Sequence, residues 1–135
     1  MTGEDRLAAL GVVLPSPAAP LANYLPFVVS GSLLAVSGQL PVGPSGKLDP
    51  AHIGKLGVEV SSKAGQEAAR LCAINILAQA KAALGDLDRI SRCVTCLSSR
   101  TVWPKGSIRW NSDRTVIWAV AAETRKPHPT TACAK

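Results

Sequence analysis

The sequence is poor in aromatic residues and has no long apolar run. Phe, Tyr and Trp make up 4% of its 135 residues, whereas hydrophobic residues together make up 47%. A core must therefore be packed mainly from Ala, Val and Leu, as in an α/β or α+β protein of one domain. No run reaches the ~18 apolar residues that a membrane-spanning helix needs, so we expect no membrane partner.

Residue patterns for several kinds of catalytic or binding site are also absent. His52 and His128 are the only histidines, and neither has a Ser or Cys motif that would predict a catalytic triad. Both lie in Pro- or Gly-flanked segments, and we expect them to be solvent-exposed. The Gly43–Lys47 segment lacks the spacing of a phosphate-binding G-x-x-x-x-G-K-[ST] loop, so we predict a surface turn there.

The cysteines predict free thiols rather than a disulfide framework. The polar N-terminus, Met1–Arg6, does not have the pattern of a signal peptide, so we expect a cytoplasmic protein. Cys93 and Cys96 form a lone Cys-x-x-Cys, and a strand would point their side chains to opposite faces. We therefore predict buried or half-buried thiols and neither a metal nor a cofactor. The four cysteines are Cys72, Cys93, Cys96 and Cys133.

Charge is spread unevenly along the chain, whose net charge is +6. Residues 1–88 contain six Lys or Arg and seven Asp or Glu, whereas residues 89–135 contain nine and two, with all three tryptophans. A basic, tryptophan-bearing segment is compatible with nucleic-acid contact. It is equally compatible with a segment that differs in origin from the rest of the chain.

A hairpin is predicted where two β-rich runs, Phe27–Val29 and Leu33–Val36, flank a glycine-containing turn. The second run continues into Ser-Gly-Gln-Leu-Pro, residues 37–41. Gly38 allows close approach to the backbone, and Pro41 cannot donate a hydrogen bond to a central sheet. A strand that ends in such small, backbone-exposing residues is suited to holding a small ligand.

Apolar residues at 3–4 spacing predict a long helix that begins after a cap at Ser61 or Ser62 and ends at Gly85. The other predicted elements are a short helix over residues 7–14, a loop over 41–57, a strand over Ile90–Leu97 and a second helix from Ser112 or Asp113 through Glu123.

Three segments together, Ala18–Val28, Ser30–Pro41 and Gly65–Asn75, resemble the RidA/YjgF family, also called endoribonuclease L-PSP. The likeness covers roughly residues 7–92. It implies one α+β domain over residues 1–135 with a chorismate-mutase-like fold: a mixed sheet with two helices on one face. It also implies a homotrimer with small-molecule sites between subunits.

The resemblance implies hydrolysis of reactive imines and enamines to 2-oxo acids and ammonia without a cofactor; some members are instead reported to cleave RNA. By position, Tyr24 matches the family's cleft tyrosine, and Ser37 and Gly38 match its ligand-lining pair. Pro129 stands where the family has its key arginine, which leaves Arg125 as the candidate for that role.

The family's glutamate-bearing final strand has no match here. We therefore expect residues 93–135 to be divergent, with the final strands missing, and hypothesise that the sequence from about residue 98 is divergent, truncated or read from an altered frame. Three functions stay open: an imine deaminase, a non-catalytic small-molecule-binding trimer, and an RNA-binding or endoribonuclease-like protein.

Overall fold

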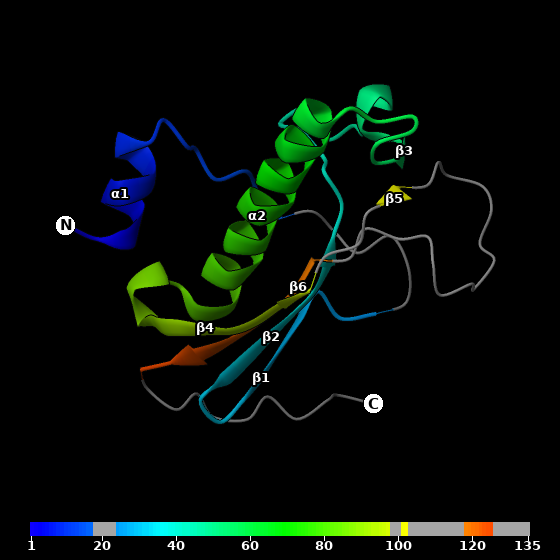
Figure 1. Ribbon diagram of the computed structural model, residues 1–135. Coiled ribbons are helices and arrows are strands. Elements are labelled where there is room, and N and C mark those ends of the chain that lie inside the picture. Colours follow the sequence, from blue (N-terminus) through cyan, green and yellow to red (C-terminus); the bar gives the residue numbers. More distant parts are fainter. Residues whose placement is uncertain (18–23, 98–100, 103–117, 126–135) are drawn as a thin grey trace.

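The computed structural model describes residues 1–17, 24–97, 101–102 and 118–125, and it has the α+β class that the sequence predicts (Figure 1). Its elements in chain order are α1 (Gly3–Ala9), β1 (Phe27–Ser30), β2 (Leu33–Gln39), the 3₁₀ turn η1 (Pro50–His52), β3 (Gly54–Lys55), α2 (Ser62–Leu84), the 3₁₀ turn η2 (Leu87–Arg89), β4 (Ile90–Leu97), β5 (Thr101–Val102) and β6 (Trp118–Thr124). No helix among these residues is long and apolar enough to span a membrane.

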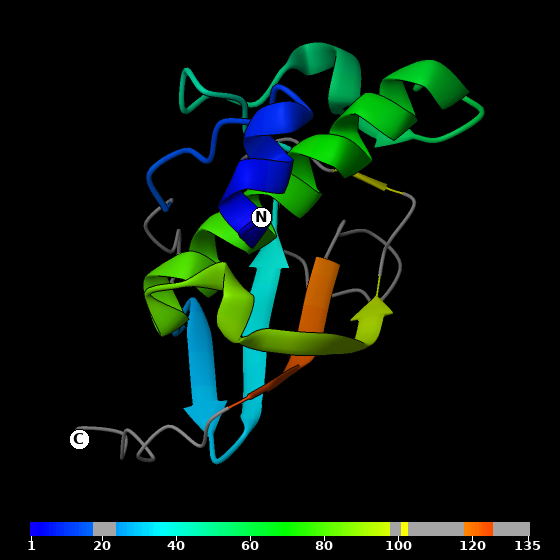
Figure 2. The same cartoon turned by 90° about the vertical axis from the view of Figure 1, so that its left-hand side faces the viewer.

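Four strands form the main sheet in the order β1-β2-β6-β4, and β3 pairs separately with β5. We expected a mixed sheet, but each strand pair in the described ranges is antiparallel. The long helix α2 lies across one face of the main sheet (Figures 1 and 2). The core forms between them, from Val29, Leu34 and Val36 of the sheet and Ile76, Ala80 and Leu84 of α2.

The predicted hairpin is present, with Ser30 opposite Leu33 at its closed end. Gly31 makes the turn with a φ of 57°, a left-handed conformation that glycine adopts without steric cost. The strand residues alternate between faces. Leu34 and Val36 are buried beneath α2, whereas Leu33 and Ala35 are exposed on the opposite face.

The long helix also forms where the sequence predicts it. The Ser61 hydroxyl caps its first turn by accepting a hydrogen bond from the Ala64 amide at 3.2 Å. Gly85 ends it in the left-handed conformation, with a φ of 80°. Between these caps, the buried positions include two amide side chains, those of Asn75 and Gln79.

The predicted second helix ending at Glu123 is wrong, because residues 118–124 form strand β6. Its other part, residues 112–117, lies outside the described ranges. β6 fills the slot between β2 and β4 and is paired along both edges. Ladder hydrogen bonds and burial of Ala122 and Thr124 on one face override the helical preference of an alanine-rich segment.

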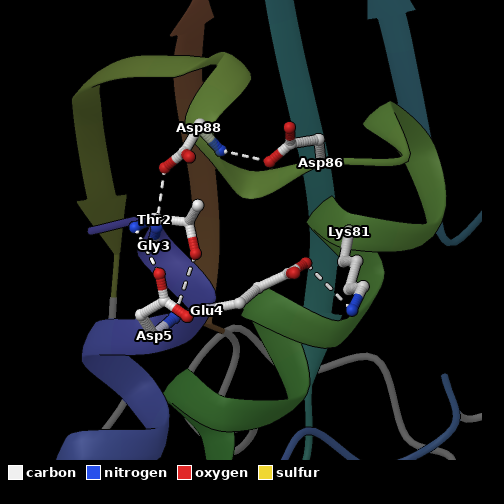
Figure 3. A network of polar contacts seen from close by, with 7 residues as sticks. All are labelled: Thr2, Gly3, Glu4, Asp5, Lys81, Asp86 and Asp88. Atoms are coloured by element: carbon white, nitrogen blue, oxygen red, sulfur yellow. Dashed lines mark hydrogen bonds and ion pairs between the residues drawn. The ribbon is translucent and has the colours of Figure 1, made fainter.

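The N-terminal helix begins earlier than the 7–14 range predicted, because Thr2 and Asp5 form a capping box, and it also ends earlier, at Ala9. Figure 3 shows how α1 is held against α2 and η2. The Gly3 amide donates to the Asp88 carboxylate at 2.6 Å, and the Glu4 carboxylate lies 2.9 Å from the Lys81 ammonium group. Leu7 packs against the edge of the main core.

The segment over 41–57 is mostly loop, as predicted, but His52 is buried with 6% of its surface exposed, so the expectation of an exposed histidine was wrong. Turn η1 packs His52 toward α2, where its Nε2 lies 4.0 Å from a Glu67 carboxylate oxygen. Its Nδ1 has no hydrogen-bond partner in the part of the chain that the structure describes. His128 lies outside that part.

Candidate functional site

The Ser37–Gly38 segment forms a β-bulge on β2. Val36 is opposite Val120 on β6, and the next paired residue of β2, Gln39, is opposite Trp118. Three steps along β2 thus match two steps along β6, which interrupts the ladder at Ser37 and Gly38. Bulges bend the strand and re-aim side chains, and they are common beside active sites. A glycine inside a strand was the sequence signal for this feature.

Two hydrogen bonds fix Ser37 against the segment that precedes β1. Its amide donates to the Pro26 carbonyl at 2.9 Å, and its hydroxyl donates to the Leu25 carbonyl at 2.5 Å. From the other side, the buried Gln39 amide donates to the Ser37 carbonyl at 3.0 Å. Since the hydroxyl proton is used on Leu25, the free lone pairs of Ser37 Oγ are available to accept a hydrogen bond from a ligand.

Helix α2 holds the continuation of the bulge in place. The Asn75 side-chain nitrogen donates to the carbonyls of Leu40 and Val42, at 2.9 and 3.0 Å. Pro41, between them, is fully buried. The residue that interrupts the apolar face of the predicted helix thus satisfies two loop carbonyls, and the segment from Ser37 to Val42 is a rigid wall of the site.

Tyr24 lies at the rim of this wall, with 45% of its surface exposed. It immediately precedes Leu25, whose carbonyl binds the Ser37 hydroxyl. The structure therefore places the backbone of Tyr24 one residue from the segment that holds the Ser37–Gly38 bulge.

Arg125, in contrast, lies at the other end of the sheet. The amide of its neighbour Thr124 donates to the Ser32 carbonyl at 2.7 Å, and its own amide donates to the Arg89 carbonyl at 2.8 Å. Ser32 precedes β2, and Ser37 lies five residues further on, about 16 Å along an extended strand. Arg125 instead lines a polar pocket with Arg6, Asp88 and Ser91.

A glutamate that sequence reasoning did not place in a strand, Glu123, lies on β6. Its carboxylate is 2.6 Å from Arg92 Nε on the neighbouring strand β4, and both side chains are largely exposed to solvent. Glu123 is opposite Leu33 on β2, so it lies at the same end of the sheet as Arg125. Within one subunit, neither charged residue approaches the Ser37–Gly38 bulge.

The described thiols are free, but their burial differs from the prediction. Cys72 is fully buried beneath the 48–53 loop, and desolvation raises the pKa of its thiol to about 12. Cys93 and Cys96 were expected to be at least half-buried and are both exposed. No three metal-ligating side chains cluster within the described ranges.

Comparison with known proteins gives the family. A family model described as "YjgF/chorismate mutase-like, putative endoribonuclease" matches residues 4–106. The chain belongs to the YjgF/chorismate-mutase-like family. It is 48% identical over 89 residues to Protein TCP17 of Trypanosoma cruzi, an alignment that covers 66% of this chain and 54% of the relative. The chain thus spans about half the length of this curated relative.

Two crystal structures share the YjgF-type fold. One is a Shewanella oneidensis protein, also described as a putative endoribonuclease, with a TM-score of 0.73 and 31% identity, covering 91% of this chain and 99% of that one. The other is a protein of unknown function from Agrobacterium tumefaciens, with a TM-score of 0.67 and 34% identity, covering 90% and 92%. The family and the chorismate-mutase-like fold inferred from residues 7–92 are therefore confirmed.

Proposed function

We propose that this chain binds small 2-imino or enamino acids at the Ser37–Gly38 bulge and hydrolyses them to 2-oxo acids and ammonia, as a homo-oligomer in the cytoplasm. The observation that carries the proposal is the bulge itself, with Tyr24 at its rim and a rigid support from Asn75. The reaction adds water across a C=N bond, so it needs a bound carboxylate, a positioned water and a proton carrier, and no redox cofactor.

Several groups at the bulge suit part of this chemistry. Ser37 Oγ can accept a hydrogen bond from the imine N–H or from the attacking water, since its own proton is held by Leu25. The Tyr24 hydroxyl, at the rim, can donate to the substrate or carry a proton. Because Gln39 holds the Ser37 carbonyl and Asn75 holds the following loop, Ser37 needs little reorganisation during the reaction.

The substrate carboxylate requires a cation that the bulge itself lacks. A guanidinium binds a carboxylate through two parallel hydrogen bonds, so an arginine is the suitable partner. Arg125 lies at the far end of the same subunit's sheet. We propose that a neighbouring subunit brings its Arg125 to this bulge, as expected for a trimer with sites between subunits.

The outer face of the sheet supports assembly into such an oligomer. Opposite α2, the hairpin exposes Val28 and Leu33, at 46% and 43%, together with Ala35. Leu25, beside Tyr24, is 55% exposed. A contiguous apolar surface of this kind marks a protein–protein contact in many folds, and its position next to Tyr24 would put the bulge at a subunit boundary.

The test is to generate 2-iminobutanoate in situ with a pyridoxal-phosphate enzyme and to follow its disappearance with and without the purified chain. We expect decay faster than in buffer, and a loss of at least tenfold for Gly38→Val, which adds a branched side chain at the bulge. The matched control is Gly43→Ala, because a methyl group there meets no atom within 4 Å. Decay no faster than in buffer would exclude the enzyme.

The oligomer and the cation are tested separately. Light scattering should give a trimer mass, and a monomer at micromolar concentration would contradict the shared site. Arg125→Lys should raise KM for the imino acid more than it lowers kcat, because it removes the second hydrogen bond to the carboxylate but keeps the charge. An unchanged KM would show that Arg125 does not bind substrate.

The alternative is binding without catalysis. It is favoured by the distance of Arg125 and Glu123 from the bulge. A product-like 2-oxo acid would then bind with unchanged affinity in Arg125→Lys, and the imine would decay as in buffer. This outcome keeps Tyr24, Ser37 and Gly38 as the ligand site and removes only the chemistry.

An RNA-directed function is the second candidate, favoured by the basic segment over residues 89–135. Two of the three arginines that the structure describes there are engaged: Arg89 with the Leu84 carbonyl and Arg92 with Glu123. If this function holds, binding to single-stranded RNA should weaken steeply between 50 and 200 mM salt, because counterions are released. Absent or salt-insensitive binding would exclude it.

A further inference from the structure

A second β-bulge lies on strand β4, on the other side of β6. Cys93 is opposite Ala122, Thr95 is opposite Ala121 and Cys96 is opposite Val120. Two steps along β4, from residue 93 to 95, match one step along β6, so Val94 is the extra residue. Neither the imine chemistry nor the first bulge uses this region.

The bulge changes the relation between the two cysteines. In a regular strand, residues 93 and 96 would point to opposite faces. Here the positions opposite them, 122 and 120, are two apart on β6 and share a face, so Cys93 and Cys96 share it as well. Two strand steps also set their Cα separation at about 7 Å, far shorter than three extended steps.

The side-chain position agrees with this register. Cys93 Sγ lies 3.4 Å from the Thr95 carbonyl oxygen, which belongs to the peptide group that joins Thr95 to Cys96. Burial, and then the charge of the Cys93 thiolate, raise the pKa of Cys96, which also indicates that the two sulfur atoms are neighbours. Both residues are free and exposed, as is every residue from Ser91 to Cys96.

We propose that Cys93 and Cys96 form a reversible dithiol–disulfide pair that hydroperoxides oxidise. One thiolate attacks an oxygen of hydrogen peroxide, the O–O bond breaks, a sulfenic acid forms, and the hydroxide leaves as water with the proton released by the first thiol. The second thiolate attacks that sulfur, the S–O bond breaks, and the hydroxide leaves as water with the proton released by the second thiol. In total, the two thiols lose two electrons and two protons, and the peroxide becomes two water molecules.

The geometry favours a labile disulfide over a structural one. Cα atoms in disulfides are usually 4.4–6.8 Å apart, so a separation of about 7 Å requires a small movement of the bulge. An exposed, strained disulfide has a higher reduction potential and is readily reduced by thiols. The pair would therefore respond to changes between oxidising and reducing conditions, whereas the buried Cys72 would not react.

The experiment oxidises the reduced full-length chain with hydrogen peroxide, alkylates the remaining thiols and digests with trypsin. Cleavage after Arg92 and Arg100 releases one peptide, residues 93–100, that carries both cysteines. We expect the mass of this peptide to fall by two hydrogens, with no alkyl group added. After reduction with dithiothreitol, both thiols should again be alkylated. Disulfide formation should be several-fold faster in the folded chain than in 8 M urea.

Three variants make the result decisive. Cys93→Ser and Cys96→Ser should each stop at a sulfenic acid that dimedone traps, and Cys133→Ser should leave the disulfide unchanged. The proposal is overturned by alkylation of both thiols after peroxide, by a disulfide to Cys133 or between chains, or by equal rates with and without urea. Imine decay is measured separately, so failure of either proposal leaves the other intact.

Discussion

Strand β6 has irregular pairing on both sides, and the bulges at Ser37–Gly38 and at Val94 differ in their support. The bulge at Ser37–Gly38 on β2 lies next to the layer covered by α2, and its neighbours Gln39, Pro41 and Asn75 are buried. The residues of the bulge at Val94 on β4 are exposed. The same interruption of a ladder thus gives a fixed wall in one place and an accessible, adaptable backbone in the other.

The difference shows that a bulge alone does not make a binding site. At β2, three side chains hold the bulge: Ser37 binds the Leu25 carbonyl, Gln39 binds the Ser37 carbonyl, and Asn75 of α2 binds the following loop. At β4, the contact that bridges the bulge is the weak one from Cys93 Sγ to the Thr95 carbonyl. Fixed groups suit recognition of a ligand, whereas exposed thiols on an adaptable backbone suit chemical modification.

The largest effect should come from removing core support beneath the first bulge. Leu34→Ala deletes a side chain with no exposed surface and should lower the free energy of unfolding by about 3 kcal/mol. Val94→Ala, at the second bulge, removes a side chain that is 56% exposed and should cost less than about 0.5 kcal/mol. Urea unfolding measures the change in unfolding free energy for each variant. Similar losses in Leu34→Ala and Val94→Ala would contradict the difference in support between the two bulges.

Removing the amide anchor should have the next largest effect. Asn75→Ala removes the side-chain donor of the Val42 carbonyl and leaves the Leu40 carbonyl with the Val42 amide alone, at a cost of about 2 kcal/mol. The matched control is Gln66→Ala, an exposed amide on the same helix, for which we expect a change under about 0.5 kcal/mol. If the two variants unfold at the same urea concentration, Asn75 does not support the bulge.

The buried thiol of Cys72 should make the stability of the folded chain depend on pH above pH 9. The pKa of Cys72 is about 12 in the folded chain, above its ordinary value of 9.0, so the unfolded chain loses this proton first as pH rises. Cys72 therefore contributes full stability below pH 9, and the contribution falls by up to about 1.4 kcal/mol per pH unit between pH 9 and 12. The free energy of unfolding of Cys72→Ala should fall less steeply above pH 9 than that of the parent chain. Parallel curves of unfolding free energy against pH would show that burial of Cys72 does not link stability to pH.

The smallest effect should come from the ion pair that helps hold α1. Glu4→Gln removes the partner of Lys81, and because both side chains are about half-exposed, the loss should be about 0.5 kcal/mol or less. The difference between this variant and the parent chain should shrink in 1 M salt, where surface charges are screened. A loss above about 2 kcal/mol would mean that α1 supports the sheet far more than its contacts indicate.

Local patterns predicted the elements that have their own start and stop signals. Ser61 and Gly85 bounded α2, Gly31 marked the hairpin turn, and the run from Ile90 to Leu97 gave β4. β6 could not be predicted, because Ala119–Ala122 has no strong strand preference and becomes a strand only through pairing with β2 and β4. The burial of His52 likewise depends on how its loop folds against α2.

The candidate site was predictable in part. Tyr24, Ser37 and Gly38 came from the family resemblance, and Gly38 was expected to allow close approach to the backbone, but the bulge was not predicted. Asn75 carried a signal that is clear in retrospect, a polar residue on the buried face of a helix, where an unpaired amide would be costly. The position of Arg125 relative to the bulge, and the shared face of Cys93 and Cys96, depend on strand register and could not be read from the sequence.

The most direct test of the central claim is a ¹H–¹⁵N NMR titration of the folded chain with 2-oxobutanoate, the product of the proposed reaction. We expect the largest shifts at the Ser37 and Gly38 amides and near Tyr24, with the Cys93–Cys96 amides unchanged. No shifts at millimolar ligand, or shifts centred on β4 or on the pocket at Arg125, would contradict the assignment of the Ser37–Gly38 bulge as the ligand site.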